Sequence, residues 1–236
     1  MKRTLGMTLV LIACKGSTES GTSPAPSVAS TSVRGLKPAM MIRHEVLAIG
    51  VRDALIQGDL DAAHRNATDL GSVKMGGSPE IDERAQAMRS AASRIATAPD
   101  VAAASRATGE LVRTCSDCHA RLTGPTRLEI DPAPRTDDSA RRARMRRHVW
   151  AMNELWDGLV GNSEEPWRAG AAVLADPALG PAELVPSRSA TPEIEQMAKT
   201  LQKLGARAQA TSDTTLRSEA YGEILSTCAG CHARTR

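Results

Sequence analysis

The pattern C-x-x-C-H occurs twice in this sequence, as Cys115-Ser116-Asp117-Cys118-His119 and as Cys228-Ala229-Gly230-Cys231-His232. This pattern is typical of c-type haem attachment. Its two thiols bond to the porphyrin, and its histidine binds the iron from one face. On a helix these three side chains share one side and can reach one macrocycle. The sequence therefore predicts two covalently bound haem c groups, with His119 and His232 as iron ligands.

Two other interpretations of a C-x-x-C pair remain open at this point. The pair can be half of a zinc site or a thiol redox couple. A single C-x-x-C-H also arises readily by chance. Two copies, each closing a similar helical segment of an exported chain, favour haem over both alternatives.

The composition limits the class of protein. Apolar residues make up 41% of the 236 residues, which is enough for a core, but there is no Phe, one Tyr and three Trp. Aromatic side chains normally supply much of a core's buried area, so a buried haem would fill a gap. The formal net charge of +3 is small, and the charged residues are scattered along the chain. It gives no reason to expect a nucleic-acid partner.

The N-terminal segment resembles an export signal. Lys2 and Arg3 precede a short apolar run, residues 5–13, which is too short to span a bilayer permanently. The run ends in Leu-Ile-Ala before Cys14, as in a bacterial lipoprotein, where this cysteine carries the lipid. We therefore expect a signal peptide at 1–13 and a lipid anchor at Cys14. An ordinary secretory peptide, giving a soluble periplasmic or secreted protein, is the alternative.

The remaining sequence is a flexible tether followed by two similar halves. The tether, residues 14–35, is rich in Ser, Thr, Gly and Pro. The halves are residues 36–122 and 139–236, and a proline-containing linker, 123–138, joins them. The first matched positions are Met41, Arg43, His44, Asp53 and Leu55 in one half, and Met145, Arg147, His148, Asp157 and Leu159 in the other.

Each half is predicted to form four helices. The expected ranges are 37–57, 59–70, 80–97 and 100–121 in the first half, and 139–161, 164–175, 191–209 and 213–234 in the second. Apolar residues recur in them at three- and four-residue spacing, as on one face of an amphipathic helix; in the first helix they include Ala48, Val51 and Leu55. Ser78 and Thr191, each followed by a proline, are the expected N-caps of the third helices. The fold expected is all-α, with two tandem four-helix bundles and a C-x-x-C-H motif near the end of each last helix.

Three further expectations concern polar and aromatic side chains. The basic run 141–147 is expected to face solvent on its helix, where it could also meet an acidic redox partner or lipid headgroups. His64 is expected to be solvated, because Arg168 takes its place in the second half. The three tryptophans occur only in the second half and are expected to pack in the core and at interfaces; they are Trp150, Trp156 and Trp167.

The combination of this fold with these motif positions resembles the class II cytochromes c, the cytochrome c′ and c-556 group. The resemblance covers nearly all of the chain after the tether, as two tandem units. It implies that residues of the first helix approach the second face of each haem. Some members of the group leave that face without a strong ligand, and some use a methionine.

The sixth iron ligand has more than one candidate here. His44 and His148 are matched between the halves and lie in the apolar stripe of the first helix. Met41 and Met145 lie one turn earlier on the same face and are the alternative ligands. An open sixth position is the third possibility.

We therefore expect a dihaem cytochrome that carries single electrons between periplasmic donor and acceptor proteins. It would be held at the periplasmic side of a bacterial membrane by its lipid anchor. We do not expect an enzyme, since no matched carboxylate lies near either motif in the sequence. A gas-binding or sensing haem protein of the cytochrome c′ type is the alternative function.

Overall fold

The computed structural model of this chain describes residues 38–76, 78–122, 133, 141–177 and 191–235. Within these ranges the fold is all-α, as predicted, with eight helices and no strand. The helices are α1 Pro38–Ile56, α2 Leu60–Gly71, α3 Pro79–Ala96, α4 Val101–Leu122, α5 Arg141–Val160, α6 Glu164–Ala175, α8 Pro192–Ala210 and α9 Thr214–Thr235. Every helix end lies within two residues of the end expected from the sequence.

The third helix of each half begins with the same local signal. The hydroxyl groups of Ser78 and Thr191 accept hydrogen bonds from the backbone N–H groups of Ile81 and Ile194. A proline follows each capping residue, where its fixed φ suits the first helical turn. The two caps fix the starts of α3 and α8, which pack against the C-x-x-C-H helices α4 and α9.

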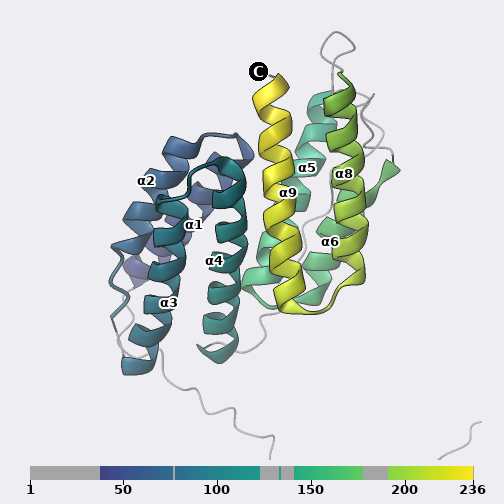
Figure 1. Ribbon diagram of the computed structural model, residues 1–236. Helices are drawn as coiled ribbons and strands as arrows, with labels where there is room; N and C mark the ends of the chain where they lie inside the picture. Colours follow the sequence, from purple (N-terminus) through teal and green to yellow (C-terminus); the bar gives the residue numbers. More distant parts are fainter. Residues whose placement is uncertain (1–37, 77, 123–132, 134–140, 178–190, 236) are drawn as a thin grey trace, which may run out of the picture. The chain divides into compact units, whose positions relative to one another are not determined.

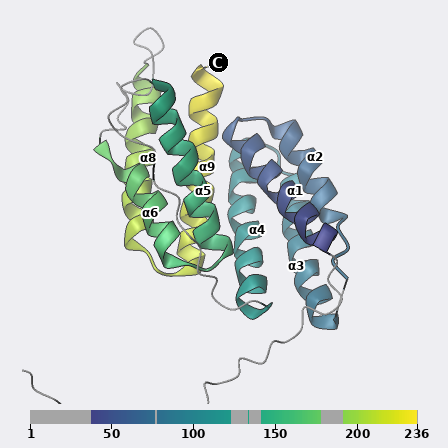
Figure 2. The same ribbon diagram turned by 180° about the vertical axis from the view of Figure 1, so that it is seen from behind.

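The helices form two groups, α1–α4 and α5–α9, in which helices that follow one another in the sequence pack together (Figures 1 and 2). The groups also contact each other, chiefly through α4 and α9, with smaller contacts of α1 on α9 and of α4 on α5. All described helices belong to one compact unit.

Two glycines allow α4 and α9 to cross closely. A Cβ atom added at Gly109 would collide with the carbonyl oxygen of Ser218, and one at Gly222 would lie 3.0 Å from that of Ser105. These contacts pair residues in opposite order, so the two helices are antiparallel (Figure 1). Ser105 and Gly109 in α4, and Ser218 and Gly222 in α9, form the same pattern, Ser-x-x-x-Gly, at matched positions of the two halves. The halves therefore meet through the same segment of each.

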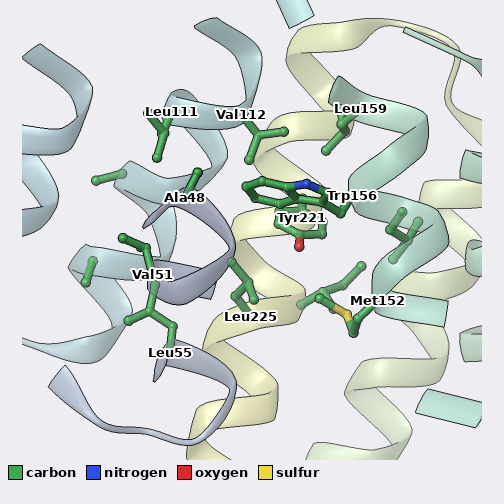
Figure 3. Close-up of a cluster of buried hydrophobic side chains, with 14 of the residues drawn as sticks. Ala48, Val51, Leu55, Leu111, Val112, Met152, Trp156, Leu159, Tyr221 and Leu225 are labelled. Carbon is green, nitrogen blue, oxygen red and sulfur yellow. The ribbon is translucent and has the colours of Figure 1, made fainter. Parts of the chain in front are cut away.

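A shared core lies beside this crossing. Figure 3 shows side chains of α1 and α4 facing those of α5 and α9, with Trp156 and Tyr221 between them. The centroids of these two rings are 6.2 Å apart. Trp167 is also buried, and its Nε1 donates to the carbonyl oxygen of Ala208 at 2.8 Å. The tryptophans expected to be core and interface residues include both of these.

Two polar residues differ from the sequence-based expectation. Arg147 belongs to a basic run expected to face solvent, but it is buried and forms an ion pair with Asp176 at 3.1 Å. His64, expected to be solvated, is partly buried, and its Nε2 lies 3.1 Å from the carbonyl oxygen of Ala98. Sequence pattern alone does not place the carboxylate or carbonyl that makes such burial possible.

Several predictions fall on residues that the structure does not describe. They are the signal peptide 1–13, the lipid anchor Cys14, the tether 14–35 and, apart from residue 133, the linker 123–138. None of the helices described is both long enough and apolar enough to span a bilayer.

Candidate cofactor sites

The first C-x-x-C-H motif lies in the last two turns of α4 and borders a cavity. The lining combines the motif residues with side chains from α1, α3 and the segment before α3. The lining residues are Met41, His44, Met75, Ile81, Arg84, Ala85, Met88, Thr114, Cys115, Cys118, His119 and Leu122. The structure thus gathers both thiols, the motif histidine and both candidate sixth ligands of this half around one space.

His44 and His119 are spaced as two axial ligands would be. Their ring centroids are 6.3 Å apart, and the ring planes are inclined by 89°. A metal-bound imidazole nitrogen lies about 2 Å from the metal and about 1 Å from its own ring centroid, so two axial imidazoles place their centroids about 6 Å apart. The separation of these two rings therefore fits an iron bound between them.

The size of the cavity requires side-chain movement before a macrocycle can enter. Its volume is about 40 Å³, room for only a few water molecules. Three of the lining residues, Met41, Met75 and Met88, are methionines, whose unbranched side chains readily change rotamer. Arg84 is likewise long and only partly buried. The residues fit haem in chemistry and in ligand spacing, and the flexible side chains are those that would make room.

The cysteines are protonated in this environment. Burial raises the pKa of Cys115 and of Cys228 to about 12, and it raises the pKa of Cys118 and Cys231 as well. Redox-active C-x-x-C thiols have lowered pKa values, because the thiolate is the reactive form. The local electrostatics of both motifs therefore oppose the thiol redox interpretation.

Three of the histidines at the motifs, His44, His119 and His148, favour the neutral form that binds metals. Burial lowers the pKa of His44 and of His119, and their mutual repulsion lowers that of His119 further. In the second half, burial lowers the pKa of His148 to about 4, and His232 and Arg147 contribute to this shift. The charges of His148 and His232 therefore act on each other, as those of His44 and His119 do. Both electrostatic interactions join histidines of the same half of the chain.

The apolar surroundings of the second motif match those of the first. Met145 and Cys231 pack against the buried Ile194. In the first half Met41 packs in the cluster that contains Ile81, the residue matched to Ile194. The methionines expected as alternative ligands thus lie beside their motifs in both halves.

Each motif also contacts the other half, which the sequence did not predict. The carbonyl of Val160, at the end of α5, accepts a hydrogen bond from His119 and raises the pKa of that ring. At the other motif, a Cβ on Gly58 would lie 3.4 Å from the carbonyl oxygen of Ala229. Gly58 and the matched Asn162 both have positive φ, at +69° and +49°. A repeated turn therefore places each half against the motif helix of the other.

The two motifs lie at opposite ends of the crossed helices. His119 is ten residues beyond Gly109, and His232 is ten residues beyond Gly222. Gly109 lies opposite Ser218, and His232 is fourteen residues beyond Ser218. At about 1.5 Å per residue, His119 and His232 therefore lie roughly 15 Å and roughly 21 Å along their helices from this level of the crossing. Because the helices are antiparallel, the two displacements have opposite directions, and the motif histidines are roughly 36 Å apart along the helices.

Some site residues were missed because they depend on packing. Arg84, Met75 and Met88 come from α3 and the segment before it, where the sequence shows only an amphipathic pattern. Comparison of the two halves does single out Arg84, because a different kind of residue, Met197, occupies the matched position. The arginines after the motifs lie outside the first cavity: Arg121 is exposed, and Arg234 donates to the carbonyl of Gly230 at 3.0 Å.

Among the described residues, no three or more His, Cys, Asp and Glu side chains gather as ligands for a bare metal ion. A haem iron needs only two protein ligands, since the porphyrin supplies the other four. No protein-family model matches this chain, and neither does any curated protein or solved structure. The functional argument therefore depends on the sites themselves.

Proposed function

We propose that this protein is a dihaem c-type cytochrome that carries single electrons between periplasmic redox proteins. Each helical group is then a four-helix bundle of the class II cytochrome type, tethered to a membrane through Cys14. The observation that carries the proposal is the cavity at which Cys115, Cys118 and His119 meet His44. When bound, haem supplies the one-electron ferric–ferrous couple.

The chain's own residues would hold and shield this couple. The cysteines fix the porphyrin covalently, and His119 and His232 bind the iron. The 6.3 Å spacing of His44 and His119 supports histidine as the sixth ligand, with His148 in the same role in the second half. Met41 and Met145 then serve as flexible packing residues. Two strong ligands leave no open position for substrate chemistry, which favours electron transfer.

The separation of the motifs bears on how electrons would move. Electron tunnelling falls steeply with distance, and the motif histidines lie roughly 36 Å apart along their helices. Each haem would therefore exchange electrons with external proteins at its own end of the molecule. This arrangement supports a carrier of two separate electrons more than a relay between two haems.

The first test is optical spectroscopy of the protein made in a bacterium that attaches c-type haem. We expect two covalent haems per chain, a low-spin spectrum and no change when carbon monoxide is added to the reduced form. A protein without covalent haem would refute the proposal. A high-spin spectrum that shifts with carbon monoxide would instead establish the gas-binding alternative and remove His44 and His148 from the ligand set.

A further inference from the structure

Arg84 is a polar side chain with incomplete partners at the first site. It lines the cavity beside Cys118 and is 22% exposed. One terminal nitrogen lies 3.4 Å from a carboxylate oxygen of Glu80, while its buried Nε has no hydrogen-bond partner. A guanidinium in this state can accept another anionic group without leaving its position.

The second site has the carboxylate but lacks this cation. Glu193 corresponds to Glu80, whereas Met197 corresponds to Arg84. Arg234 is the cation that acts on Cys231 there, but it is exposed and already donates to Gly230. Charge in solvent is screened much more strongly than charge beside a buried cavity. Arg147 is a buried cation that acts on His148, but Asp176 pairs with it at 3.1 Å, closer than the 3.4 Å between Arg84 and Glu80. Arg84 is therefore the less neutralised of the two arginines, and it acts on a motif cysteine.

We propose that Arg84 binds a carboxylate of the first haem and thereby gives the first haem a higher reduction potential than the second. This inference rests on the proposed dihaem function. Haem carries two carboxylate side chains, and a guanidinium matches a carboxylate in planar, two-point hydrogen bonding. The unpartnered Nε of Arg84 supplies a donor for this contact.

The direction of the effect follows from charge. Oxidised iron carries one more positive charge than reduced iron, so a nearby cation destabilises the oxidised state. Arg84 also neutralises a carboxylate that would otherwise stabilise oxidised iron. Both effects favour reduction of the first haem. The protein would thus accept its first electron at the α4 site and its second at the α9 site.

The test is a redox titration of the protein with both haems attached, followed by optical absorbance. We expect two resolved one-electron transitions. Arg84→Met should lower the higher potential, and Met197→Arg should raise the lower one. A tenfold change in either equilibrium constant, which corresponds to about 59 mV, would be a clear effect. Arg94→Met is the matched control, because Arg94 is on the same helix but exposed and paired with Glu110.

The outcomes separate this inference from the function on which it rests. A parent protein without haem refutes both. A single unresolved transition in the parent, or an unmoved potential in Arg84→Met with both haems attached, refutes only the role of Arg84. If Arg84→Met attaches one haem, Arg84→Lys provides the comparison, since it keeps the charge and should keep two resolved potentials. Met197→Arg then tests the charge effect separately, and an unmoved lower potential overturns the proposal.

Discussion

The rings of His44 and His119 stand almost perpendicular to each other across the first cavity, with 6.3 Å between their centroids. One ring comes from the first helix of the half and the other from the last. The spacing depends on how α1 and α4 pack, so neither residue determines it alone. It is also the distance that two axial ligands of one iron require.

Removing one of these histidines should open one iron. In the haem-loaded protein, His44→Ala should make one of the two haems high-spin and able to bind carbon monoxide, because water or gas can then reach the sixth position. His148→Ala should do the same to the other haem. Carbon monoxide titration of the reduced protein, followed by absorbance, measures both effects. Met41→Leu is the control, and gas binding by that variant would identify Met41 as the ligand.

The haem-free protein should lose stability in mild acid. The pKa of His148 falls from its ordinary value of 6.5 to about 4 on folding, so the unfolded chain binds more protons between these values. Stability from the neutral ring is complete above pH 6.5 and declines as the pH falls towards 4. The effect is at most about 3 kcal/mol, and solvent screening reduces it.

Denaturant unfolding of the haem-free protein between pH 7.5 and pH 4.5 measures this dependence. His148→Gln should flatten it, because the amide does not titrate in this range. Burial also lowers the pKa of His44 and His119, so the free energy of unfolding of the variant should still depend on pH, but less steeply. Equal slopes for the parent and the variant would show that His148 is not buried as described.

Helix α4 should not tolerate a larger residue at its crossing with α9. Gly109→Ala should lower the free energy of unfolding by about 1–3 kcal/mol, since its methyl group meets backbone atoms that cannot move alone. Gly222→Ala should cost less, because its nearest contact is at 3.0 Å. Gly71→Ala serves as the control, as nothing lies within 4 Å of the added atom. Chemical denaturation that ranks the three variants differently would contradict the crossing.

Patterns local to one helix were readable from the sequence. The spacing of Ala48, Val51 and Leu55 predicted the buried face of α1, and Ser78 and Thr191 predicted the starts of two helices. The matched halves predicted that His44 and His148 would have equivalent positions. Such features depend on residues within a few turns of each other, where helical geometry alone fixes which side chains share a face.

Features that depend on contacts between distant helices were not readable. Ser105 and Gly109 resemble ordinary helix residues until the opposing backbone of α9 is in place. The hydrogen bond from His119 to Val160 uses a backbone carbonyl, which leaves no trace in side-chain chemistry. Arg147 looked solvated because its partner, Asp176, lies in a loop with no periodic pattern.

The crossing of α4 and α9 has the symmetry of an isologous contact, because each helix presents the same Ser-x-x-x-Gly segment to the other. A two-fold contact of this kind is satisfied by two units and offers no equivalent surface to a third. Solenoid repeats differ, since each unit stacks on the next in one direction and the array can grow. The duplication in this chain thus makes a closed pair, in effect a homodimer within one polypeptide.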